Sequence, residues 1–226
     1  MRFDAVAFDL DGTLYPAHRL YALAFPLMLP KARRLAAFNS ARRRIRTLGS
    51  NPAYRRAPPA DGEAFRSLQA RLVGESLGLG PAEARAMIDR DFYREVEELF
   101  SRVRPFDGLI PTLDAFARAG LRLALLSDLP PERKLELLGL TGRFESSLCS
   151  EDSGFLKPAP EPFAMLASRL CMPAHRILYV GNSPRIDVAG AKAAGMSSAV
   201  VSRRRVAGAD LSFRDWRKLV DFALGD

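Results

Sequence analysis

The sequence contains few of the residues that hold structural metal ions or covalent cross-links. Its 226 residues include two cysteines, Cys149 and Cys171, and two histidines, His18 and His175. A structural zinc site usually takes four such ligands at close spacing, so a zinc cluster is excluded. Both cysteines lie among apolar residues in the sequence, and we expect buried, reduced thiols rather than a disulfide.

The chain also lacks a long apolar run. The longest covers residues 22–29, includes Pro26, and is far too short to cross a bilayer. The N-terminus shows no apolar signal segment followed by a small-residue cleavage site. We therefore expect a soluble, cytoplasmic protein with no membrane partner.

Acidic residues are missing from one basic stretch. The formal net charge is +8, and residues 15–103 carry +7 of it. Residues 31–56 hold nine lysines and arginines and no acid: Lys31, Arg33, Arg34, Arg42, Arg43, Arg44, Arg46, Arg55 and Arg56. Such a stretch could attract a phosphorylated substrate, bind nucleic acid, or form a solvated helix face. We favour the solvated face and do not expect nucleic acid as a partner, because basic and aromatic residues do not interleave here as a platform for single-stranded nucleic acid would require.

Apart from that stretch, the composition is that of a globular protein, with 48% apolar and 27% charged residues. Apolar runs of strand length at 3–8, 121–126, 146–149, 177–180 and 198–201 alternate with helical patterns. This alternation predicts an α/β fold with a doubly wound parallel sheet. Residues 15–103 contain no strand-like run and predict helices that are interrupted at Pro26, Pro30, 51–59 and 79–81. We therefore expect a core formed by residues 1–14 and 104–226, with a helical domain, 15–103, inserted after the first strand.

Two carboxylates follow directly on the first strand. Asp9 and Asp11 are two residues apart, so in an extended chain their side chains point the same way. Ligands of doubly wound sheets bind at this end of the strands, and two adjacent carboxylates repel unless a cation or a shared proton offsets the repulsion. An alternative is a turn in which the aspartates cap a helix and Gly12 supplies the bend.

Further polar residues follow three other predicted strands. They are Ser127 after the second, Lys157 shortly after the third, and Asn182 and Asp187 after the fourth. Each has an ordinary explanation alone, as a helix cap, a solvated charge or a residue favoured by a helix dipole. Together they predict a shared site at one edge of the sheet.

These four segments resemble the motifs of the haloacid dehalogenase-like (HAD) hydrolases. Residues 9–13 match Asp-x-Asp-Gly-Thr, Ser127 matches the Ser or Thr that ends a strand, and 157–163 match a Lys-Pro-x-Pro segment. Residues 181–196 match the fourth motif except that Asn182 replaces an acidic residue. The resemblance covers 1–14 and about 104–200, and it implies a Rossmann-like core with residues 15–103 as an α-helical cap.

The resemblance also implies residue roles. Asp9 is the expected nucleophile that forms an aspartyl-phosphate, and Asp11 the expected acid and base. Ser127 and Lys157 are expected to bind the phosphoryl group. Mg²⁺ is expected to be held by Asp9, Asp187, the Asp11 backbone carbonyl and Asn182, more weakly than by a fully acidic set.

Two aspartates, Asp11 and Asp128, refine this expectation. Branches of the family that attack carbon lack an acid at the position of Asp11, so this residue favours phosphoryl transfer over dehalogenation. Asp128 follows Ser127 where a neutral residue is common, and we expect it to point away from the phosphate or to pair with a basic residue.

The expected function is therefore a magnesium-dependent phosphomonoester hydrolase for a nucleotide, a sugar phosphate or a phosphoglycolate-like acid. A phosphomutase on the same scaffold and a non-catalytic basic module that binds phosphate or nucleic acid stay open as alternatives. The chain could be a monomer or a homodimer, with residues 22–29 as cap core or as a dimer patch. We expect five aromatic and sulfur-containing residues to form inter-helix core: Tyr15, Tyr21, Phe25, Met28 and Phe38.

Overall fold

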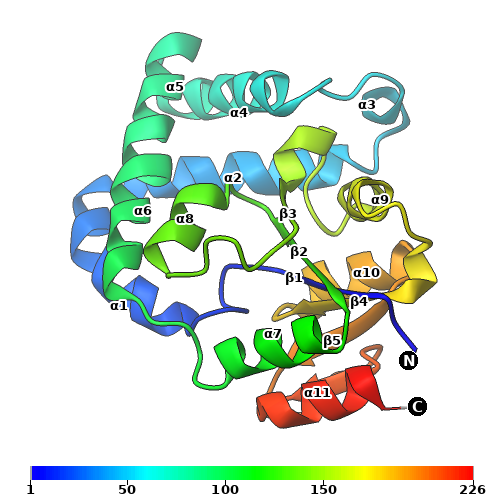
Figure 1. The fold of residues 1–226 in the computed structure, drawn as a ribbon. Helices are drawn as coiled ribbons and strands as arrows, with labels where there is room; N and C mark the ends of the chain where they lie inside the picture. Colours follow the sequence, from blue (N-terminus) through cyan, green and yellow to red (C-terminus); the bar gives the residue numbers. More distant parts are fainter. Residues whose placement is uncertain (1, 226) are drawn as a thin grey trace.

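A computed structural model of the chain describes residues 2–225, and its centre is one six-stranded sheet in the order β3-β2-β1-β4-β5-β6 (Figure 1). The strands are β1 (Ala5–Phe8), β2 (Arg122–Ser127), β3 (Ser146–Cys149), β4 (Ile177–Gly181), β5 (Ser197–Val201) and β6 (Leu211–Phe213). All five strand pairs are parallel, with β1 between β2 and β4. This confirms the predicted doubly wound sheet. Strand β6 was not predicted from the sequence, because it has only three residues.

Side chains of β1 alternate between two apolar layers because successive residues of a strand point to opposite faces. Val6 and Phe8 join one buried cluster, while Ala5 and Ala7 join the other. The first layer is completed by α7 (Leu109–Arg118), α8 (Glu132–Leu137) and α11 (Trp216–Leu224). The second is completed by α9 (Pro160–Arg169) and α10 (Ala189–Ala193). Both faces of the sheet are therefore covered, which leaves the strand ends to carry the polar groups.

Residues 15–103, called the helical insert below, form helices and no strand in the structure. They are α1 (Ala17–Met28), α2 (Ala32–Leu48), α3 (Pro52–Arg56), α4 (Gly62–Leu77), α5 (Pro81–Ile88) and α6 (Glu95–Glu98), with short helical turns η1 (Leu29–Lys31), η2 (Asp89–Arg94) and η3 (Leu99–Arg102). Most of its buried apolar residues, with Ile45, Phe65 and Val73 among the most buried, make a cluster separate from the two layers of the sheet. In Figure 1 the insert extends from α4 and α5 at the top down the left side to α1, and α7 and α11 lie at the bottom.

Helix α1 differs from the sequence-based expectation. Pro26 lies inside the helix rather than ending it. Tyr21 and Phe25, expected in the core, are 69% and 65% exposed, and Leu29 is 60% exposed. These three residues are four apart and share one side of the helix, whereas Leu20 and Met28 are buried on another. Because proline has no N–H, one backbone carbonyl in the preceding helical turn lacks its donor. On the exposed side of the helix, solvent can donate to that carbonyl instead. Of the other expected core residues, Tyr15, Met28 and Phe38 are buried.

The two cysteines also differ from each other. Both are free, but only Cys149 is buried, whereas Cys171 is exposed. Cys171 follows the end of α9 with a positive φ of 49°, the left-handed conformation in which a helix commonly ends. Its apolar sequence neighbours therefore do not cover it, and the expectation of two buried thiols was wrong for this residue.

A bilayer crossing would need a helix both longer and more apolar than any between residues 2 and 225.

Candidate active site

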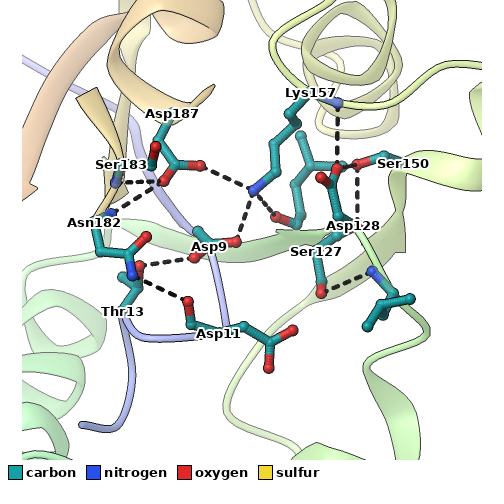
Figure 2. A network of polar contacts seen from close by, with 12 residues as sticks. Asp9, Asp11, Thr13, Ser127, Asp128, Ser150, Lys157, Asn182, Ser183 and Asp187 are labelled. Atoms are coloured by element: carbon teal, nitrogen blue, oxygen red, sulfur yellow. Dashed lines mark hydrogen bonds and ion pairs between the residues drawn. The ribbon is translucent and has the colours of Figure 1, made fainter. Parts of the chain in front are cut away.

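The predicted site residues lie at the carboxyl ends of the central strands (Figure 2). Asp9 follows β1 directly, and its backbone N–H donates to the carbonyl of Val180 on β4 at 2.8 Å. The chain then turns at Gly12, which has a φ of +87° and would place a Cβ only 2.1 Å from the Asn182 amide nitrogen. Glycine is required here by both the backbone conformation and the close approach of Asn182.

Lys157 holds the centre of the site. Its ammonium group donates to Asp9 Oδ1 at 2.7 Å and to Asp187 Oδ1 at 3.0 Å. It also contacts the Leu126 carbonyl and the Tyr179 hydroxyl, at 3.2 and 3.0 Å. Burial acts to lower the pKa of Lys157, but the facing carboxylates of Asp187 and Asp9 outweigh it and hold the pKa above its usual value. The group therefore stays cationic.

The carboxylate of Asp9 is buried and held at both oxygens. Oδ1 accepts from Lys157, and Oδ2 accepts from the Thr13 hydroxyl at 2.8 Å. Burial raises the pKa of Asp9 to about 7, with a further rise from Asp187 and an opposing effect of Lys157. The orientation of this carboxylate is fixed before any ligand binds.

Asp187 lies in the turn η6 (Pro184–Val188) that follows β4. Its Oδ2 accepts from the backbone N–H groups of Asn182 and Ser183, at 3.1 and 2.9 Å. Gly181 makes this approach possible, because a Cβ on it would lie 2.3 Å from the Cβ of Asp187. The Asn182 side chain donates in turn to the backbone carbonyl of Asp11 at 3.1 Å.

Asp11 reaches the site through its backbone, while its carboxylate points away from Asp9 (Figure 2). That carboxylate accepts from the Tyr15 hydroxyl and from the Lys134 ammonium group, each at 2.8 Å. Neither partner of Asp11 was predicted from the sequence. Tyr15 had been assigned only to the core, and no motif marks Lys134, which α8 contributes.

Ser127 is the last residue of β2, and Asp128 follows it. Ser127 is buried, and its hydroxyl accepts from the backbone N–H of Leu129 at 3.2 Å. Asp128 pairs with a basic residue, as expected, since its Oδ2 accepts from Arg46 at 2.7 Å.

Two arginines of the basic stretch are not on a solvated face. Arg42 is buried and Arg46 is mostly covered, and both contact the loops of the sheet domain. This corrects the expectation for these residues, whereas Arg33, Arg43 and Arg44 are exposed. Acidic and carbonyl groups from distant parts of the sequence bind Arg42 and Arg46, so the local helical pattern could not predict where these side chains lie.

The oxygen atoms gathered here fit a hard divalent cation. Within residues 2–225 no three Asp, Glu, His or Cys side chains are grouped so that they could hold a metal ion by themselves, so Asp9 and Asp187 would need further oxygen donors. The other oxygen donors are the Asp11 carbonyl and the amide of Asn182. A half-turn of that amide exchanges its nitrogen for its oxygen next to Asp11. Two carboxylates, a carbonyl and an amide oxygen form the kind of donor set that Mg²⁺ takes, with one charge fewer than an acid at position 182 would give.

The sequence and the fold are similar to those of known hydrolases. The family model of the haloacid dehalogenase-like hydrolases matches residues 3–195. The chain is 31% identical over 221 residues to a phosphoglycolate phosphatase of Salmonella paratyphi A, covering 85% of this chain and 79% of that protein. It is 29% identical over 204 residues to an N-acetylmuramic acid 6-phosphate phosphatase of Pseudomonas aeruginosa, covering 89% and 82%. Among solved structures, an L-2-haloacid dehalogenase shares the fold with a TM-score of 0.69 and 22% identity over the full length of both chains.

Proposed function

The chain belongs to the haloacid dehalogenase-like hydrolase family, and from this membership we propose that it is a magnesium-dependent phosphatase of small phosphorylated metabolites. The observation that carries the proposal is the contact of one buried ammonium group, Lys157, with both Asp9 and Asp187. Relatives of about 30% identity that carry phosphatase names support the reaction class. The dehalogenase likeness, at 22% identity, bears on the fold alone.

In the proposed first step an oxygen of Asp9 attacks phosphorus. The new bond joins that oxygen to phosphorus, and the ester bond from phosphorus to the leaving oxygen breaks. For this step the Asp11 side chain turns from Lys134 and Tyr15 toward Asp9 and takes up a proton from solvent, which it then gives to the leaving oxygen. In the second step a water molecule attacks the aspartyl-phosphate, Asp11 accepts the water's proton, and inorganic phosphate leaves.

Lys157 and Ser127 bind the phosphoryl oxygens in this proposal. The Lys157 ammonium group stabilises the negative charge that spreads over those oxygens in the transition state. Asp9, Asp187, the Asp11 carbonyl and Asn182 would hold Mg²⁺, which when bound offsets the repulsion between carboxylate and phosphate. The presence of Asp11 supports phosphoryl transfer over attack on carbon. The proposal keeps the cytoplasmic location that the sequence suggests.

The test is the release of phosphate from p-nitrophenyl phosphate and from a panel of phosphorylated metabolites, with Mg²⁺ and with a chelator. We expect Mg²⁺-dependent turnover that is lost in Asp9→Asn and retained in Asp114→Asn, a control on the outer helix α7. Isomer interconversion of a sugar phosphate without phosphate release would instead identify a phosphomutase. Absence of turnover with every ester, together with salt-sensitive binding to nucleic acid, would identify a binding module and overturn the proposal.

A further inference from the structure

One arginine of the helical insert holds the backbone that carries the central lysine. Arg46 of α2 donates from Nε to the carbonyl of Lys157 at 2.9 Å and from Nη2 to Asp128 Oδ2 at 2.7 Å. The other oxygen of Asp128 accepts from the backbone N–H of Lys157 at 3.2 Å. Both backbone polar groups of Lys157 are therefore bonded, one by each member of the Arg46–Asp128 ion pair (Figure 2 shows the Asp128 side).

A second arginine holds the same segment from one helical turn away. Arg42 donates from Nη2 to the backbone carbonyl of Asp128 at 2.5 Å. Its other terminal nitrogen donates to Glu151 at 2.6 Å and to Gln69 of α4 at 2.9 Å. Since Asp128 follows Ser127 directly, the helical insert is hydrogen-bonded to the backbone at or next to both proposed phosphate-binding residues, Ser127 and Lys157.

Asp128 is the charged link in this arrangement. Burial acts to raise its pKa, but Lys157, Arg42 and Arg46 outweigh that effect and hold the pKa below its usual value. The carboxylate also accepts from the Ser150 hydroxyl at 2.7 Å. The ionised Asp128 side chain can make all of these contacts in only one orientation. It therefore restricts the movement of the chain segments that carry its partners.

We infer that Arg46 and Arg42 are positioning residues of the phosphate-binding site, acting through Asp128 on Ser127 and Lys157. This inference rests on the proposed function for its chemical consequence and adds to it an assignment for part of the basic stretch. The two arginines do not touch the phosphate: they fix the backbone from which the binding groups extend. Catalysis is sensitive to such placement, because a displacement of about 1 Å can lower a rate about 100-fold.

Kinetics of Arg46 variants test the inference. Arg46→Ala is expected to lower kcat/KM about 100-fold and to raise the inhibition constant of inorganic phosphate about tenfold. Arg46→Lys keeps a cation that can pair with Asp128 but loses the planar guanidinium group with its several N–H donors. Its kcat/KM and its inhibition constant for phosphate should therefore fall between those of the wild type and Arg46→Ala. Arg43→Ala is the matched control, an exposed arginine of the same helix, and should stay within about twofold of the wild type.

The double variant Arg46→Ala/Asp128→Ala separates positioning from simple loss of stability. If the two residues act as one unit, the double variant loses no more kcat/KM than the more damaged single variant. A loss of kcat/KM in the double variant equal to the product of the two single losses would contradict the inference. Kinetics and phosphate inhibition of Arg46→Ala equal to those of the wild type would contradict it as well.

Amide hydrogen exchange gives a readout that needs no turnover. The backbone amides of residues 154–157 should exchange faster in Arg46→Ala than in Arg43→Ala, because the bond from Arg46 to the Lys157 carbonyl is lost and Asp128, which accepts from the Lys157 N–H, loses its pairing with Arg46. Unchanged exchange in this segment would overturn the inference even if activity fell. A wild-type protein that hydrolyses no phosphate ester would overturn the proposed function instead, and the exchange result would still decide whether α2 holds the loop.

Discussion

The Lys134 ammonium group lies 2.8 Å from the carboxylate of Asp11, and this carboxylate points away from Asp9. Lys134 is buried and also sits 5.3 Å from the centre of the Phe100 ring. The Asp11 side chain, by contrast, is 36% exposed. The proposed acid and base is thus also the carboxylate partner of a buried cation, so its replacement affects the folded state as well as the reaction.

The first prediction concerns that pair. Asp11→Asn should lose turnover and also lower the free energy of unfolding by about 1–3 kcal/mol, because the Lys134 cation stays buried without its carboxylate. In a Lys134→Met background the same change should cost much less. Urea denaturation of the four proteins measures both values. Equal losses in the two backgrounds would show that the pair does not stabilise the fold.

The second prediction concerns the metal. Asn182→Asp adds a carboxylate next to the Asp11 carbonyl and Asp187, so it should strengthen Mg²⁺ binding about tenfold. The rise of the melting temperature with Mg²⁺ concentration gives the affinity without any turnover. Asn39→Asp, on an exposed position of α2, controls for the added charge. Unchanged or weaker Mg²⁺ binding in Asn182→Asp would argue against position 182 as a ligand.

The third prediction uses the close contact at Gly181. A methyl group there would meet the Cβ of Asp187 at 2.3 Å, so Gly181→Ala must displace the carboxylate that Lys157 and two backbone N–H groups hold. We expect a loss of kcat/KM of about 100-fold or more. Gly80→Ala is the control, since a Cβ at Gly80 meets nothing within 4 Å. Turnover close to that of the wild type in Gly181→Ala would mean that Asp187 is not needed in its observed place.

The fourth prediction concerns pH. The pKa of Asp128 is lowered in the folded protein, so the ionised group stabilises the fold above its unfolded pKa, and this contribution is lost as the pH falls through the folded pKa. The difference in melting temperature between the wild type and Asp128→Asn should therefore be constant near neutral pH and shrink below about pH 4. A difference that stays constant down to pH 3 would contradict the assignment of the stabilisation to the charge.

The sheet and the convergence of polar groups were predictable from the sequence because both have local causes. Runs of strand length gave the first five strands, and residues directly after parallel strands must meet at one edge. Asp9, Ser127, Asn182 and Asp187 lie at that edge for this reason. Lys157 follows after a loop, and its place came from the matched motif.

The rest depended on contacts between residues distant in the sequence. Arg42 lies 109 residues before Glu151, and Lys134 lies 123 residues after Asp11, so no periodic pattern links the members of either pair. The outward direction of Tyr21 and Phe25 had a similar cause. An apolar run shows that a helix has apolar side chains, but only the packing of neighbouring helices decides which of them are covered.

The chain leaves the sheet for the helical insert and returns to it at nearly the same point, where the Phe106 N–H donates to the Leu14 carbonyl at 2.9 Å. A different helical segment could be grafted at this junction without changing the connections between strands. Such a graft would bring its own surface toward the substrate, yet it would also remove the guanidinium groups that Asp128 binds. A chimera of this kind should inherit the reaction chemistry in full only if the donor segment supplies arginines at the positions of Arg42 and Arg46.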